Sequence, residues 1–193
     1  MSLFGNAKIL LASQSPRRRQ LVQLLGIPYQ IVDISVDEVL PHPVEASVVA
    51  ETLAALKAEG YNRALLPNEI LLTADTAVVL DDKVLGKPKS LAEAAEMLSS
   101  LSGRAHEVYT GVCLKTQKQK KVFSECTKVF FRELSAEAIE YYINHCNCMD
   151  KAGAYGIQEW IGLYGVERID GCFYNVMGLP VARICKEIET SGL

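Results

Sequence analysis

One stretch near the N-terminus decides the fold class: KILLASQSPRRRQLVQLLG, residues 8–26. Its apolar beginning, residues 8–12, predicts a short buried strand. Ser15-Pro16 then provides a helix cap followed by proline at the first helical position. The predicted helix carries leucines at i, i+3 and i+4, which are Leu21, Leu24 and Leu25. A strand, a tight polar turn and a helix N-terminus therefore follow one another directly, as they do in α/β proteins.

The rest of the chain continues this pattern of strands and helices. Strands are expected over residues 29–32, 70–80, 84–85, 106–114 and 121–131, and helices over residues 47–60, 90–103, from 135 onward and from 181 onward. Asp81-Asp82 predicts a hairpin turn, and Ser90 with Glu93 predicts a capping box. We therefore predict an α/β fold with a mixed sheet, and a single domain over residues 1–193.

The composition excludes several classes of protein. The chain is 49% hydrophobic, with 20 basic and 23 acidic side chains and a net charge of −3, which argues against disorder and against a nucleic-acid coat. No apolar run reaches about 18 residues, so no membrane-spanning helix is expected. Six cysteines without C-x-x-C spacing, and no secretory signal, indicate a reducing compartment. We expect a cytoplasmic protein that binds neither nucleic acid nor membrane.

Residues 13–19, SQSPRRR, form the first candidate site. Backbone N–H groups at a helix N-terminus bind anions, and guanidinium groups match the geometry of phosphate oxygens. The alternative is a capped, solvated turn, but cations in a first turn oppose the helix dipole and cost up to about 1 kcal/mol. A bound anion would remove that cost, so we expect a phosphate site that includes Arg17, Arg18 and Arg19.

The second candidate is Asp75, which lies in the sequence TADT inside the predicted strand 70–80. Alternation places it on the same face as Thr73, Ala77 and Val79, where it is the one charged residue. Burying a carboxylate is costly unless a cation or a metal ion compensates it. The alternative is an exposed position on a partly polar strand, but the small and apolar neighbours favour a functional carboxylate.

Three further segments carry polar groups at turns. Gly86-Lys87-Pro88 restricts the backbone around a lysine and so directs a point charge. Asp37-Glu38 follows a predicted strand, where adjacent carboxylates are usually solvated turn residues. Residues 150–158, DKAGAYGIQ, surround a lysine, a tyrosine and a glutamine with small side chains, as expected where the backbone approaches a flat ligand. A plain turn or glycine-rich connection is the alternative for each, and residues 175–180, NVMGLP, are adequately explained as a turn.

Taken in order, the segments ASQSPRR, ADT, GKP, DKAGAYGIQ and NVMGLP resemble the Maf family of nucleotide pyrophosphatases, from Ala12 to about Cys185. DKAGAYGIQ resembles the branch that acts on dTTP and UTP. The resemblance implies an elongated mixed sheet flanked by helices, with a central cleft between two lobes, as in the Maf/ITPase-like fold. It also implies hydrolysis of nucleoside triphosphates to the monophosphate and pyrophosphate with Mg²⁺ or Mn²⁺, and a homodimer.

The resemblance implies roles for individual residues. Asp75 is the proton acceptor that activates water, Lys87 and Glu38 are catalytic beside it, and Glu38 and Asp75 are oxygen ligands of the metal. Substrate binding and preference are assigned to Ser13, Arg17, Arg18, Thr76, Lys151 and Gln158. The residues themselves leave open whether Asp75 deprotonates water directly or mainly holds the metal.

Two other functions fit the same segments. A regulator of cell division would bind a nucleotide without hydrolysing it, although such a protein need not keep Asp75, Glu38 and Lys87 together. A pyrophosphatase of the same fold would select 7-methylguanosine or purine triphosphates. Under the leading hypothesis the substrates are pyrimidine nucleoside triphosphates, with modified pyrimidine nucleotides included.

Overall fold

The computed structural model describes residues 4–37, 39–40 and 44–191. Seven strands form one mixed sheet: β1 (Lys8–Leu11), β2 (Tyr29–Ile31), β3 (Glu69–Leu80), β4 (Lys83–Leu85), β5 (Ala105–Lys115), β6 (Lys120–Phe131) and β7 (Val166–Asp170). Their order is β2-β1-β3-β5-β6-β7, and β4 pairs with the C-terminal end of β3. β1 is parallel to β2 and β3, whereas β3, β5, β6 and β7 pair antiparallel. The predicted mixed sheet is therefore confirmed.

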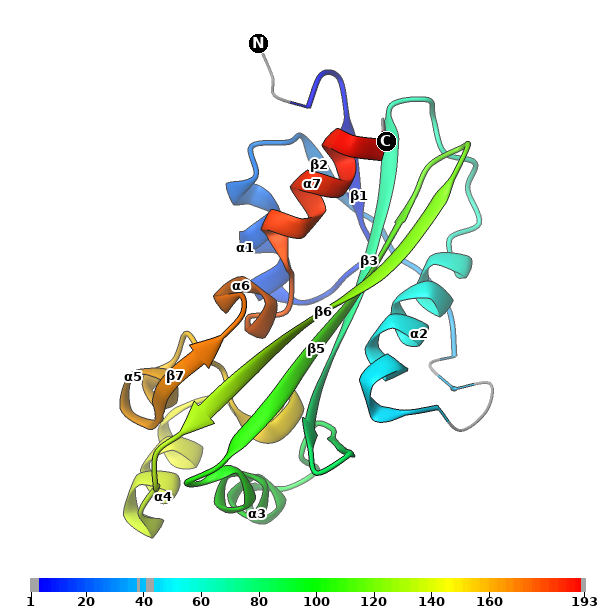
Figure 1. Ribbon diagram of the computed structural model, residues 1–193. Helices are drawn as coiled ribbons and strands as arrows, with labels where there is room; N and C mark the ends of the chain where they lie inside the picture. The colour runs from blue at the N-terminus through cyan, green and yellow to red at the C-terminus, as the bar shows by residue number, and fades with distance from the viewer. Residues whose placement is uncertain (1–3, 38, 41–43, 192–193) are drawn as a thin grey trace.

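Helices flank this sheet on both faces (Figure 1). They are α1 (Pro16–Leu24), α2 (Ala46–Glu59), α3 (Leu91–Leu101), α4 (Ala136–His145), α5 (Trp160–Gly165), α6 (Phe173–Val176) and α7 (Val181–Ser191), with a 3₁₀ helix, η1 (Ala152–Ala154). In Figure 1, α2 lies on one side of the long strands and α1 and α7 lie on the other, while α3 and α4 lie at the lower end of β5 and β6. The long strands β3, β5 and β6 thus connect two groups of helices.

Alternate residues of the central strands enter two hydrophobic clusters, one on each face of the sheet. Ile9 and Leu11 of β1 belong to the larger cluster, which also includes residues of α1, α3, α4 and α7. Leu10 between them belongs to a smaller cluster, with Leu71 of β3 and Ala58 of α2. Both faces of the central strands are therefore covered, so a polar side chain on β3 projects into protein rather than directly into solvent.

Two turn predictions are confirmed by the backbone. Asp81 and Asp82 connect β3 to β4 with φ values of 49° and 61°, the left-handed conformation typical of a two-residue hairpin. At the start of α3, the Ser90 hydroxyl accepts from the Glu93 N–H at 3.1 Å. The Glu93 carboxylate in turn accepts from the Lys89 N–H at 2.7 Å, one residue earlier than in the usual capping box.

The predicted stripe of three leucines on α1 is wrong at its middle position. Leu21 is buried, but Leu24 is 73% exposed at the last residue of the helix. Leu25 packs against the larger cluster from just beyond the helix, and Gly26 follows with a φ of 68°. The reason is the shortness of α1, nine residues, whose buried face is made by Leu21 and Val22.

Candidate functional site

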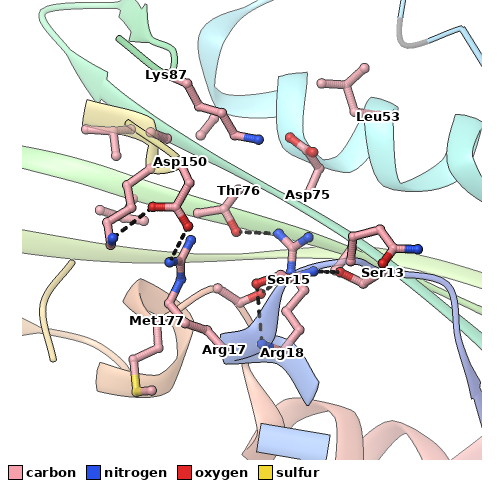
Figure 2. A pocket seen from close by; sticks show the side chains of 18 of the residues that line it. Ser13, Ser15, Arg17, Arg18, Leu53, Asp75, Thr76, Lys87, Asp150 and Met177 are labelled. Carbon is pink, nitrogen blue, oxygen red and sulfur yellow. Dashed lines mark hydrogen bonds and ion pairs between the residues drawn. The ribbon is translucent and has the colours of Figure 1, made fainter. Parts of the chain in front are cut away.

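A cleft of about 710 Å³ lies where the N-terminus of α1, the middle of β3, the loop after β4 and residues 150–158 meet (Figure 2). The predicted site residues that line it are Ser13, Arg17, Arg18, Asp75, Thr76, Lys87, Lys151 and Gln158. Segments that are far apart in the sequence thus contribute to one concave site. Glu38, the other predicted site residue, lies outside the described residues.

The turn between β1 and α1 is held by its own serines. The Ser13 hydroxyl accepts from the Ser15 N–H at 3.2 Å, and the Ser15 hydroxyl caps α1 by accepting from the Arg18 N–H at 3.5 Å. Pro16 is the first helical residue, and the first turn carries arginines with no acidic residue. The positive end of the helix dipole, with Arg17 and Arg18, therefore lies at the cleft, as the sequence predicts for an anion site.

Arg18 is oriented by a chain of hydrogen bonds that crosses the cleft wall. Its guanidinium donates to the Gly178 carbonyl oxygen at 2.8 Å and to the Thr76 hydroxyl at 3.0 Å. The Thr76 and Thr110 hydroxyls are 3.0 Å apart, and Thr110 donates to the Asn175 carbonyl oxygen at 2.9 Å. The Thr110 hydroxyl has one proton, and it donates that proton to the Asn175 carbonyl oxygen. Thr76 must therefore be the donor between the two hydroxyls, and its oxygen accepts from Arg18.

Arg19 does not share this environment, and its predicted place at the phosphate site is wrong. It is absent from the cleft lining, and its guanidinium donates to the Gln14 side chain at 2.8 Å. The physical reason is the helical period of about 100° per residue, which turns Arg19 away from the face that carries Arg17 and Arg18 toward the cleft.

Asp75 projects from β3 and forms an ion pair with Lys57 of α2, with 2.5 Å between Oδ1 and Nζ. Their side chains are 18% and 12% exposed, so the pair is largely shielded from water yet reaches the cleft. The helix is held close to the strand, because the Thr73 hydroxyl donates to the Ala54 carbonyl oxygen at 2.6 Å. The sequence predicts that a carboxylate at this position needs a compensating cation or metal ion. In the structure, the cation is Lys57.

Lys57 was not among the predicted site residues. The sequence does hold a signal for it, since Ala50, Ala54 and Lys57 are spaced i, i+4 and i+7 and so share one face of the helix. A lysine on a face of alanines that packs against a sheet needs an acceptor there. Which strand residue provides that acceptor depends on the tertiary arrangement of α2.

Lys87 and Gln158 offer uncommitted polar groups at the cleft. Both are exposed cleft residues, and neither has a hydrogen-bond or ion-pair partner within the described parts of the chain. Figure 2 shows the Lys87 side chain extending into the cleft toward the side where Asp75 lies. These groups are available to a ligand without breaking an existing contact.

Lys151, in contrast, is buried and fully bonded. Its ammonium donates to the Asn147 carbonyl oxygen and contacts Asp150 Oδ1 at 2.8 Å and Glu159 Oε1 at 2.9 Å. A Cβ at Gly156 would lie 2.9 Å from the Lys151 side chain, so the glycine makes room for this cluster. The sequence predicts that the small residues of the 150–158 segment let the backbone approach a flat ligand. The structure shows that they also make room for the buried Lys151 side chain.

Tyr142 completes the cluster from α4. Its hydroxyl donates to Glu159 Oε2 at 2.5 Å and accepts from the Gly156 N–H at 3.1 Å. Burial and the Glu159 carboxylate raise the pKa of Tyr142, so the hydroxyl keeps its proton and remains a donor. Glu159 is thus bonded on both oxygens, and the residue before it, Gln158, is carried on a firmly anchored segment.

The carboxylates of the cleft fit a metal ion that is shared with a substrate. Within the described ranges, no group of three or more His, Cys, Asp or Glu side chains is close enough to hold an ion. Mg²⁺ commonly keeps several water ligands and binds through one or two carboxylates together with substrate phosphates. Asp75, whose Oδ2 is not the oxygen paired with Lys57, matches that mode of binding.

This chain is similar to several known proteins. The chain matches the family model described as "Maf-like protein" over residues 8–191. A dTTP/UTP pyrophosphatase from Bacteroides thetaiotaomicron is 48% identical over 183 residues, covering 94% of this chain and 95% of that protein. One from Christiangramia forsetii is 45% identical over 187 residues, covering 97% and 95%. The Ham1 protein of Staphylococcus aureus superposes with a TM-score of 0.47 at 18% identity, covering 64% of this chain and 71% of that chain.

Proposed function

We propose, because this chain belongs to the Maf family, that it is a nucleoside triphosphate pyrophosphatase that hydrolyses dTTP and UTP to the monophosphate and pyrophosphate. The observation that carries the proposal is the Asp75–Lys57 pair in a cleft that also receives the N-terminus of α1 and the unpaired Lys87. In phosphoryl transfer, cations stabilise the charge on the phosphates, and a carboxylate shielded from bulk water positions the attacking water or accepts its proton. The cleft provides both kinds of group. The names of the relatives support the choice of substrate.

The triphosphate binds at the basic end of the cleft under this proposal. Ser13, the N-terminus of α1 and Lys87 provide hydrogen-bond donors and positive charge around one space. Arg18 adds a guanidinium whose direction is already fixed by Gly178 and Thr76. Such preorganised donors stabilise the charge that develops on a leaving pyrophosphate without having to reorient during the reaction.

Asp75 is the proposed proton acceptor. Water attacks the α-phosphorus, its proton passes to Asp75, and the bond to the bridging oxygen breaks with its electron pair remaining on pyrophosphate. Lys57 fixes the carboxylate through Oδ1, which leaves Oδ2 either to take the proton directly or to hold the metal ion beside the water. When bound, a divalent ion supplies charge neutralisation to the phosphates, and we propose that Asp75 and Glu38 hold it.

Arg17, Thr76 and Gln158 are the proposed determinants of base preference. Among the residues that the structure describes, nothing bonds to the amide of Gln158, so both its donor and its acceptor are free, and Thr76 and Arg17 line the same cleft. The family resemblance assigns Lys151 to substrate binding, as a further contact to phosphate. Its three bonds support instead the proposal that it organises the substrate site by holding Asp150 and Glu159.

A nucleotide panel tests the proposed function. Purified protein is incubated with Mg²⁺ or Mn²⁺ and UTP, dTTP, CTP, GTP or 7-methyl-GTP, and released pyrophosphate is compared as kcat/KM. We expect UTP and dTTP to be the preferred substrates. Tight nucleotide binding without pyrophosphate release would instead support the regulator, and a preference for 7-methyl-GTP or GTP would support the purine-selective enzyme.

Replacing Lys87 with methionine tests the anion site. Lys87→Met removes the charge but keeps most of the apolar side chain, and we expect kcat/KM for UTP to fall by roughly 10- to 100-fold, the effect of one charge-assisted hydrogen bond. Lys89→Met is the matched control, because Lys89 is exposed two residues away and is absent from the cleft lining. Equal activity of the two variants, or a large fall in Tm for Lys87→Met with full activity per folded molecule, would make Lys87 structural.

The single domain, the cytoplasmic location and the homodimer stay predictions. Across residues 4–37, 39–40 and 44–191, no helix combines the length and the apolar character needed to cross a bilayer.

The net charge of −3 and the basic cleft together favour a small polyanion as the ligand.

A further inference from the structure

We propose that Asp150 is a specificity-determining residue, which accepts the N3–H of thymine or uracil and disfavours cytosine. This inference rests on the proposed function, since it concerns the base of the same substrate. Asp150 was quoted in the sequence segment DKAGAYGIQ without a role of its own. Its place in the cleft, its bonds and its charge each support a contact with the base edge.

The two ends of the cleft differ in chemistry. Lys57, Asp75 and Lys87 bring charge to one part, where Ser13 adds a neutral hydroxyl, whereas Met177 contributes an apolar side chain at the other. The cleft lining also includes the apolar side chains of Val108, Ala152 and Val176. Figure 2 shows Met177 next to Arg17, with Asp150 at the guanidinium end of the Arg17 side chain, all on the opposite side of the cleft from Ser13. A base has apolar faces and a polar edge, so it fits the Met177 end while the phosphates occupy the charged end.

Asp150 lines the cleft beside Arg17, and its carboxylate can accept further hydrogen bonds. Its Oδ2 accepts from the Arg17 guanidinium at 3.1 Å, and its Oδ1 accepts from Lys151 at 2.8 Å. A carboxylate accepts up to about four hydrogen bonds, so lone pairs remain on both oxygens. The side chain is 42% exposed and lines the cleft, so a ligand can reach them.

The neighbours of Asp150 keep it ionised and in place. Burial by itself raises the pKa of Asp150, but the hydrogen bond and charge of Lys151, with the charge of Arg17, outweigh burial and hold the pKa below its ordinary value. Lys151 is itself fixed between Asp150 and Glu159, with its side chain 5% exposed. Asp150 is therefore an acceptor and never a donor near neutral pH.

Arg17 and Asp150 together present a donor next to an acceptor. Uracil and thymine offer the complementary pattern on their Watson–Crick edge, with the O4 acceptor adjacent to the N3–H donor. Cytosine offers the reverse, with an amino donor at position 4 and an N3 lone pair that would face the Asp150 carboxylate. A buried polar group that must face a like group penalises the wrong ligand strongly, which is the basis of selectivity in such pockets.

The test is the ratio of kcat/KM for UTP to that for CTP in the wild type and in Asp150→Asn. Asparagine has the same shape but carries an amide donor that can face cytosine N3. We expect the ratio to fall by about 10- to 100-fold in Asp150→Asn, the effect of one hydrogen bond to a charged group. Asp81→Asn is the matched control, because Asp81 pairs with Arg104 at 2.7 Å outside the cleft lining, and it should leave the ratio unchanged.

An equal loss for UTP and CTP would overturn the inference, because Asp150 would then act only by supporting Arg17. A second measurement needs no variant: wild-type protein should process N3-methyl-UTP at least about tenfold less efficiently than UTP, and equal rates would also overturn it. If the wild type hydrolyses no nucleotide, the proposed function fails by itself. The ratio of the Kd values for UTP and CTP, in wild type and Asp150→Asn, then still decides the role of Asp150.

Discussion

Asp75→Asn is expected to lower the turnover of UTP and dTTP by about 10²-fold or more while nucleotide binding persists. The amide has nearly the same shape as the carboxylate but cannot accept the proton of the attacking water. It also replaces an ion pair of 2.5 Å with Lys57 by a neutral contact. The binding groups at the N-terminus of α1 and at Lys87 are unchanged, so the loss should appear in kcat rather than in Kd.

Single-turnover kinetics and calorimetric nucleotide binding separate these two quantities. Asp33→Asn is the matched control, because Asp33 also lines the cleft but is exposed and accepts a hydrogen bond from Gln14 at 2.9 Å. It removes the same charge from the same cleft and should change turnover by less than about tenfold, as expected of an exposed charge. Near-normal turnover by Asp75→Asn would exclude Asp75 from the reaction centre.

Several of the predicted site residues are marked by a local signal, whereas Glu38, Lys151 and Gln158 are assigned by the family resemblance. Ser13 and Arg17 lie where a strand meets a capped helix, Asp75 interrupts an apolar strand, and Lys87 lies between glycine and proline. These signals act over a few residues, so they can be read from the chain directly. For the same reason the mixed sheet, the hairpin turn at Asp81-Asp82 and most helices could be predicted.

The parts that could not be predicted depend on tertiary contacts. Lys57 becomes a site residue only because α2 covers the face of β3 that carries Asp75, and Arg17 reaches Asp150 across 133 residues of sequence. The edge strand β7 lies in a glycine-rich region, and its pairing with β6 is what defines it. The helical period separates Arg19 from Arg17, but which face of α1 lies at the cleft depends on how the helix packs on the sheet.

Gly111→Ala should have a large effect on stability, because Gly111 is where α2 comes closest to the sheet. Gly111 lies directly opposite Asp75 in the antiparallel pair of β3 and β5, so its missing side chain would project toward α2. A Cβ there would lie 2.2 Å from the Ala50 carbonyl oxygen and 2.3 Å from the Glu51 nitrogen. These are backbone atoms, so the whole helix must move. We expect the free energy of unfolding to fall by about 3 kcal/mol, measured by urea denaturation.

The same displacement should reach the chemistry. Lys57 is carried by α2, so a helix pushed away from β5 draws its ammonium away from Asp75, and activity per folded molecule should fall together with stability. Gly86→Ala is the matched control, since a Cβ there meets no atom within 4 Å, and its stability should stay within about 0.5 kcal/mol of the wild type. Wild-type stability of Gly111→Ala would contradict the close packing of α2 on β5. Reduced stability with full activity would instead show that the Asp75–Lys57 pair tolerates displacement of the helix, and that Lys57 contributes little to turnover.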